Sequence, residues 1–161
     1  MERIEKHEYY LNIALEVAKR GTCLRRNYGA VIVKDDEIIA TGYTGAPRGS
    51  LNCCDIGECR RQALNIPSGE RYELCRSVHA EMNAVISASR SDMKGATLYL
   101  AGWEMENGVF SKPIAKAEPC MLCKRVIVNA GIQLVISKSS YDEEGQVLTQ
   151  SPGLWLSLDI V

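Results

Sequence analysis

The sequence predicts an α/β fold, a single three-layer α/β/α domain over residues 1–161 with a central mixed sheet of about five strands. The order of helical and strand-like segments and the length and composition of the chain lead to this prediction. Segments with helical periodicity alternate with short runs of β-branched apolar residues. Helices that connect the later strands would make those strands parallel. A length of 161 residues fits one domain, and 46% apolar with 24% charged residues is typical of a folded globular chain.

The first part of the chain predicts a helix, a hairpin and a long loop. Over residues 5–20, apolar residues recur on one helical face: Leu11, Ala14, Leu15 and Ala18. The apolar runs Ala30–Lys34 and Glu37–Tyr43, joined through two aspartates, indicate a β-hairpin. From about Thr44 to Arg76 the sequence is loop-like, and loops of this length are usually functional or held by something other than a core.

The rest of the chain continues the alternation of helices and strands. A helix is expected to start near His79, with a strand at Thr97–Ala101. A second helix at Cys120–Ala130 ends at a glycine, and the strand Ile132–Ser137 has an apolar run that suits burial on both faces. Beyond it, one more strand or short helix is expected around residues 146–158.

Charge and hydropathy exclude several classes of function. The formal net charge is −1, so the chain has no global basic field for long nucleic acid or an anionic membrane. No run approaches the roughly 20 apolar residues of a membrane span, and the N-terminus lacks the apolar region of a signal peptide. We therefore expect a cytoplasmic protein. Seven cysteines, an odd number, suit metal binding or chemistry better than a disulfide framework.

Two short motifs carry the chemistry. His79 and Glu81 open one predicted helix, and Cys120 and Cys123 open another. Residues three apart on a helix are about 60° apart, so both thiolates reach one ion. Two thiolates and one imidazole with an open fourth position are the ligand set of a catalytic zinc. Glu81 is then free to carry protons. Each motif alone is also typical of structural or redox roles, but together they favour catalysis.

The HAE motif at 79–81 followed by PCxxC at 119–123 resembles the zinc-dependent cytidine/deoxycytidylate deaminase superfamily. Cys23-x-Arg25, the GYTG motif at 42–45 and Cys75 are similar to its deoxycytidylate deaminase branch. The resemblance implies a cytidine deaminase-like fold and hydrolysis of dCMP to dUMP and ammonia, with Glu81 protonating N3 and the leaving amino group. It also implies that the Ala80 carbonyl accepts from the substrate amine. Thr44 stands where the family usually has a sugar-contacting asparagine, which leaves the exact substrate open.

The remaining cysteines suggest a second, structural zinc. Any single one of them is explained by packing in the core, but five cysteines in the first half of the chain are better explained by a metal site. The resemblance points to Cys23 and Cys53 as ligands. Cys59 and Cys75 are our choice for the other two, with Cys54 as the substitute.

The resemblance favours Arg25 as the phosphate-binding residue. Other arginines that could serve are Arg26, Arg48, Arg60, Arg61 and Arg71, although surface arginines are mostly solvated. Three alternatives stay open. The first is a deaminase of cytidine or guanine, which would need no phosphate-binding arginine. The second is a tRNA adenosine deaminase, which would need a basic face, and the third is a non-catalytic zinc-stabilised binding module, which would not need Glu81. The resemblance also implies a homo-oligomer, often a hexamer.

Overall fold

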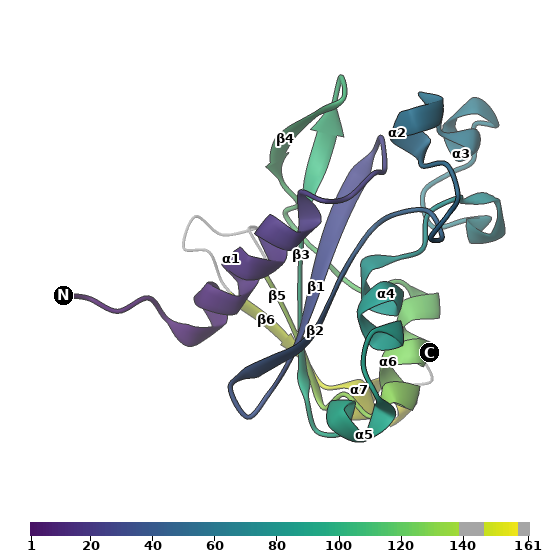
Figure 1. The fold of residues 1–161 in the computed structure, drawn as a ribbon. Coiled ribbons are helices and arrows are strands. Elements are labelled where there is room, and N and C mark those ends of the chain that lie inside the picture. Colours follow the sequence, from purple (N-terminus) through teal and green to yellow (C-terminus); the bar gives the residue numbers. More distant parts are fainter. Residues whose placement is uncertain (139–146, 158–161) are drawn as a thin grey trace.

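The computed structural model describes residues 1–138 and 147–157, which form a central sheet with helices on both faces (Figure 1). In chain order the elements are α1 (Lys6–Ala18), β1 (Arg26–Lys34), β2 (Glu37–Tyr43), α2 (Cys53–Ile56), α3 (Arg60–Ala63), the 3-10 turn η1 (Tyr72–Leu74), α4 (Ala80–Ile86), α5 (Arg90–Met93), β3 (Thr97–Glu106), β4 (Val109–Pro113), α6 (Met121–Ala130), β5 (Leu134–Lys138), β6 (Val147–Gln150) and α7 (Pro152–Ser157). None of the helices in these residues has the length and apolar character that crossing a bilayer requires.

The sheet is mixed, as the sequence predicts. Five strands lie in the order β2-β1-β3-β5-β6, and β4 pairs with β3. β1 is antiparallel to both β2 and β3, whereas β3 and β5 are parallel because α6 connects them as a crossover. β6 is antiparallel to β5 and completes the described sheet.

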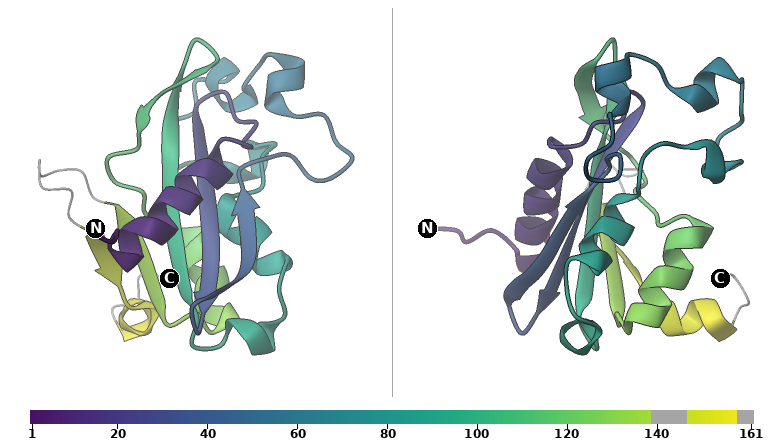
Figure 2. Two further views of the ribbon diagram at one scale, coloured as in Figure 1. Left: turned by 60° about the vertical axis from the view of Figure 1, so that its left-hand side comes forward. Right: turned by 45° about the vertical axis from the view of Figure 1, so that its right-hand side comes forward.

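Helices cover both faces of the sheet, which confirms the three-layer prediction. α1 lies on one face, while α4 and α6 lie on the other (Figure 2). The side chains of β1 alternate between two cores: Val31 packs on the α1 side and Ile32 on the α4 and α6 side. Tyr99 and Leu98 of β3 divide in the same way. This period of two is what a strand buried on both faces requires.

One hairpin matches the sequence prediction, and a second was missed. Asp35 and Asp36 both have positive φ (51° and 67°), as the turn between β1 and β2 requires. Asn107 and Gly108 have the same conformation (52° and 79°) between β3 and β4. The Asn-Gly pair is a strong hairpin signal, so this sequence did contain the indication that β3 continues past Ala101 and turns back.

Two further expectations are corrected. The segment from Thr44 to Arg76 is not wholly irregular, because it contains α2, α3 and η1. These elements are three or four residues long, too short for periodicity to reveal. After Ser137 the chain forms both a strand and a helix, β6 and α7, where one element was expected. Both ends of that expected element, Gln146 and Leu158, lie outside the described residues.

Candidate metal centre and its pocket

Three of the expected zinc ligands meet in space. The Nδ1 atom of His79 lies 3.4 Å from the Sγ of Cys120 and 3.3 Å from the Sγ of Cys123. All three donor atoms lie within 4.8 Å of one another. Zinc bonds of about 2.3 Å to sulfur and about 2.0 Å to nitrogen place such atoms about 3.5 Å apart on one tetrahedral ion. The donor set and its spacing therefore fit zinc, with one coordination position left for a reactant.

The starts of two helices bring these side chains together. His79 is the N-cap of α4, and Cys120 is the N-cap of α6. Val78 and Gly45 form an isolated antiparallel bridge, with N···O distances of 2.7 and 3.2 Å, which ties the residue before His79 to the end of β2. Both motifs were expected at helix starts, and the three donor atoms lie together there.

The electrostatics of the cluster favour an ionised thiol. A hydrogen bond with Cys123, assisted by His79, lowers the pKa of Cys120 to about 4. The hydrogen bond with Cys120 raises the pKa of His79. The same thiol pair, together with burial, raises the pKa of Cys123. Because thiolates are the form that binds metal, Cys120 is prepared for coordination at neutral pH.

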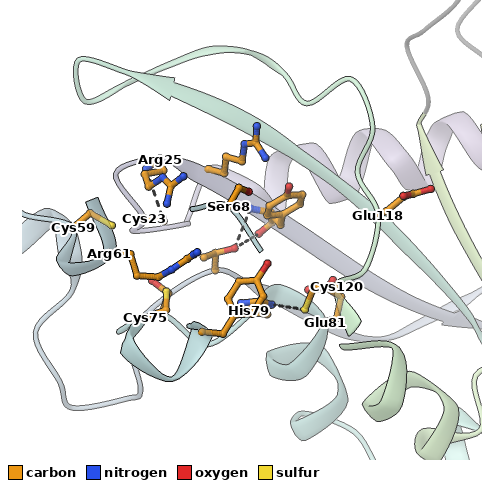
Figure 3. A pocket seen from close by; sticks show the side chains of 15 residues that line it. Cys23, Arg25, Cys59, Arg61, Ser68, Cys75, His79, Glu81, Glu118 and Cys120 are labelled. Carbon is orange, nitrogen blue, oxygen red and sulfur yellow. Dashed lines mark hydrogen bonds between the residues drawn. The ribbon is translucent and has the colours of Figure 1, made fainter. Parts of the chain in front are cut away.

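Glu81 lies beside the cluster and is buried, with 5% of its surface exposed. Burial raises the pKa of its carboxyl group above the ordinary value. Glu81 lines the same cavity as His79 and Cys120, as Figure 3 shows. A carboxyl group whose pKa is raised holds a proton more readily than an ordinary carboxylate and can still release it, which is the property of a general acid–base.

The cavity has a volume of about 150 Å³ and extends from the metal cluster to a group of cationic side chains. It is lined by Cys23, Arg25, Arg26, Tyr28, Thr44, Cys59, Arg61, Ser68, Tyr72, Cys75, Ser77, His79, Glu81, Glu118 and Cys120. Arg26 is paired with Glu104 at 3.0 Å. Arg25, the residue favoured from the sequence for the phosphate, is partly buried and lines the cavity. Arg48 lines a different cavity.

Thr44 and Ala80, the other two residues expected to contact the substrate, differ in their position relative to the cavity. Thr44 lines the cavity, but its Oγ1 accepts a hydrogen bond from the Tyr28 backbone N–H at 3.0 Å. Ala80 is fully buried and is not among the residues that line the cavity. Its carbonyl oxygen lies against Gly42 of β2. The structure therefore brings Thr44 to the pocket and does not bring Ala80 to its wall.

The loop cysteines gather around a neighbouring cavity of about 460 Å³, which Cys23, Cys53, Cys59 and Cys75 all line. Among the described residues, however, only His79, Cys120 and Cys123 place three donor atoms within 4.8 Å. Burial raises the pKa of Cys53, and the charges of the other three thiols raise it further. Cys54 is exposed and lines neither cavity.

Nothing in the sequence indicated Tyr72, and Arg61 was named only as one of several arginines that could bind the phosphate. Tyr72 lies edge-on to the His79 ring, with centroids 5.1 Å apart at 82°. Arg61 is only 7% exposed, although surface arginines are mostly solvated. Both lie in elements of three or four residues between β2 and α4, which are too short for periodicity to indicate which way a side chain points. No signal in the sequence singled out either residue.

The fold and the donor set together define a zinc-binding deaminase domain. Residues 4–139 match the model of the cytidine and deoxycytidylate deaminase zinc-binding region, and the chain belongs to this family. The deoxycytidylate deaminase of Mycobacterium phage D29 is 36% identical, over 84% of this chain and 96% of its own length. The dCMP deaminase of cyanophage S-TIM5, solved in apo form, has 25% identity and a TM-score of 0.58, with 88% of each chain covered.

Longer relatives also match. The deoxycytidylate deaminase of Schizosaccharomyces pombe is 32% identical over 92% of this chain, but the match covers 42% of its own length. The chain thus spans almost the whole of the phage D29 relative and less than half of the fission yeast one.

Proposed function

We propose that this chain is a zinc-dependent aminohydrolase that converts dCMP to dUMP and ammonia. The observation that carries the proposal is the convergence of His79 Nδ1 with the Cys120 and Cys123 thiols, beside the buried carboxyl group of Glu81. The match to a deaminase family and the relatives named deoxycytidylate deaminase support this activity.

The side chains have separate tasks in this reaction. His79, Cys120 and Cys123 would hold the zinc ion, which supplies Lewis-acid activation of a water molecule when bound. Glu81 accepts a proton from the attacking water as its oxygen approaches C4 of the pyrimidine. Glu81 donates that proton to N3. It then carries the second proton of the attacking water to the leaving amino group, which departs as ammonia. Burial supports this task because it raises the pKa of Glu81.

The cationic end of the pocket favours a mononucleotide substrate. Arg25, Arg26 and Arg61 line one small cavity, while the whole chain carries a formal net charge of only −1. A free nucleoside or base, such as cytidine or guanine, offers no anion for these guanidinium groups. A tRNA substrate requires a basic face rather than a few clustered arginines. A non-catalytic zinc module would gain nothing from burying Glu81.

We extend the proposal to the substrate contacts, the metal content and the state of the protein. Arg25 would bind the phosphate and Thr44 the sugar, whereas the Ala80 carbonyl, which lies against Gly42, is assigned no substrate contact. Cys23, Cys53, Cys59 and Cys75 would hold a second, structural zinc in the cavity that they line. The chain would act as a homo-oligomer, with a hexamer expected, in the cytoplasm, where its seven free thiols suit a reducing environment.

A substrate panel tests the proposed activity. Zinc-loaded protein is incubated with dCMP, CMP, deoxycytidine, cytosine and guanine, and ammonia release is measured. We expect the highest kcat/KM for dCMP. A higher value for a nucleoside or a base would contradict the substrate assignment, and no ammonia from any of the five compounds would contradict the activity.

A further inference from the structure

Arg61 is a buried arginine of α3 whose hydrogen-bonding capacity is only partly used. Its side chain is 7% exposed and lines the pocket that contains the metal centre. Nη2 donates a hydrogen bond to the Pro67 carbonyl oxygen at 2.7 Å. Nε is buried and has no hydrogen-bond partner among the described residues. A buried N–H group without an acceptor is costly, so its persistence calls for an explanation.

The positive charge of Arg61 also lacks an anionic partner. In the described part of the chain, Arg26 pairs with Glu104 and Arg71 pairs with Glu73, but no carboxylate lies within ion-pairing distance of Arg61. Its described hydrogen bond goes to a backbone carbonyl and not to a cysteine sulfur. A buried guanidinium that is neither exposed to water nor paired is expected to bind an anion.

Aromatic contacts hold the Arg61 guanidinium at a defined distance from the metal centre. Its Cζ atom lies 4.9 Å from the centroid of the Tyr72 ring, and that ring lies 5.1 Å from the ring of His79. One aromatic side chain therefore separates the cation from a metal-ligand candidate. Figure 3 shows the Arg61 side chain reaching into the pocket between Arg25 and His79. A pyrimidine at His79 and Glu81 would direct the other end of a nucleotide toward these arginines.

We propose that Arg61 binds the phosphate of the nucleotide substrate and thereby makes the enzyme select nucleotides over nucleosides. The inference rests on the proposed deaminase activity and assigns a residue to its specificity. The Nε–H group donates to a phosphate oxygen, and the guanidinium charge compensates the phosphate charge. Pro67 and Tyr72 hold the side chain in place before the substrate arrives, so little conformational entropy is lost on binding. Arg25 faces the same phosphate from the segment before β1.

Substitutions at Arg61 test the inference through the ratio of two substrates. Arg61→Met and Arg61→Lys are compared with wild type for kcat/KM toward dCMP and toward deoxycytidine. Arg71→Met is the matched control, because Arg71 is exposed, paired with Glu73 and outside the pocket. Loss of a charge-assisted hydrogen bond should lower the dCMP value by about 10- to 150-fold with Arg61→Met and leave the deoxycytidine value nearly unchanged. Arg61→Lys should fall between this variant and wild type, because it keeps the charge but not the fork of donors.

The outcomes separate this inference from the proposed activity. Wild-type turnover of dCMP tests the activity, whereas the substrate ratio of the variants tests Arg61. Equal losses for both substrates, no loss for either, or loss of bound zinc from Arg61→Met would overturn the inference.

Hydrogen exchange of the wild-type protein provides a test that does not depend on folding of the variants. Saturating dUMP should slow exchange of the backbone amides of residues 60–68, and saturating deoxyuridine should not. Unchanged exchange of these amides with dUMP would overturn the inference even if both Arg61 variants failed to fold.

Discussion

Glu81 and Cys120 show how the surroundings set the chemistry of single side chains. Burial raises the pKa of Glu81, while hydrogen bonds lower the pKa of Cys120 to about 4. The two groups line one cavity, yet burial disfavours the charged form of Glu81 while hydrogen bonds favour the charged form of Cys120. The thiolate suits metal binding, and the protonatable carboxyl group suits proton transfer.

Replacing Glu81 with glutamine should separate metal binding from turnover. The amide fills the same volume but cannot exchange a proton at neutral pH, so kcat should fall by about 10²–10⁴-fold. Zinc content should not change, because Glu81 is not one of the three clustered donors. Burial of an ionised carboxylate opposes folding at neutral pH, so Tm should stay equal or rise. Turnover within a few-fold of wild type would contradict the assigned role.

Arg25 provides a second prediction for a single residue, which concerns the preference for dCMP over deoxycytidine. Arg25→Ala should lower kcat/KM for dCMP by about 10- to 150-fold, because a charge-assisted contact with phosphate is lost. Deoxycytidine has no phosphate, so its value should hardly change. Arg48→Ala provides the control, since Arg48 lines a separate cavity. Equal losses for both substrates would mean that Arg25 supports the fold rather than the phosphate.

At the scale of elements, the contact between β2 and α4 positions the catalytic end of α4. A Cβ atom added at Gly42 would lie 2.3 Å from both the Ala80 carbonyl oxygen and the Ala84 nitrogen. Both atoms belong to the backbone of α4, so they cannot move away as a flexible side chain would. The absence of a side chain at Gly42 therefore allows α4 to pack against the sheet with His79 and Glu81 at its start.

Gly42→Ala should displace α4 and damage stability and activity together. Overpacking of a tight contact costs typically about 1–3 kcal/mol, and here the overlap is with backbone. We expect a lower free energy of unfolding and a larger relative loss of kcat for dCMP than of bound zinc. Thr41→Ala, at the exposed neighbouring position, should change neither the free energy of unfolding nor kcat. A Gly42→Ala protein with wild-type stability would refute the close packing.

The segment between β2 and α4 contains most of the cysteines that the catalytic centre does not use. If Cys23, Cys53, Cys59 and Cys75 hold a structural zinc, purified protein should contain two zinc ions per chain by elemental analysis. Cys53→Ser should remove one of them and lower Tm, because a bound metal stabilises the folded state. The exposed Cys54 offers the comparison, and Cys54→Ser should keep both ions. One zinc per chain in wild type and in Cys53→Ser would rule out this site.

At the scale of the whole molecule, the layer of α1 stabilises the fold, and the opposite helical layer carries the site. The core under α1 contains Tyr10, Leu11 and Ile136, and none of these residues lines the site pocket. The opposite layer contributes the starts of α4 and α6, where the metal candidates lie. The segment between β2 and α4, which contains α2, α3 and η1, adds Arg61 and Tyr72 to the pocket.

Oligomeric assembly is the property for which the whole molecule gives a prediction. Several large apolar side chains of the described helices are strongly exposed, among them Ile86 at 77%, Met121 at 60% and Leu154 at 60%. If these side chains form one continuous apolar surface, that surface would suit contact with another copy of the chain. Light scattering on the zinc-loaded protein should give a multiple of the 17.8 kDa chain mass, with a hexamer expected. A monomer at micromolar concentration would contradict the homo-oligomer.

The sequence by itself determined the layered α/β architecture and the chemistry of the metal centre. Helical periodicity and β-branched runs are local signals, so α1, the first hairpin and α6 were predictable from neighbouring residues. The spacing of Cys120 and Cys123 on one helix start and the HAE motif identified the cluster that the structure brings together. The Asn107-Gly108 turn was equally local and could have revealed β4.

Only the tertiary structure decided which arginines face the pocket and what holds His79 in place. Arg61 and Tyr72 precede His79 in a segment without periodicity, and their orientation depends on contacts with Pro67 and with each other. The pairing of Gly45 with Val78 and the packing of Gly42 on Ala80 likewise join residues that are more than thirty positions apart. Composition and spacing describe residues along the chain, whereas burial of a charge and the approach of two backbones arise only when distant segments pack together.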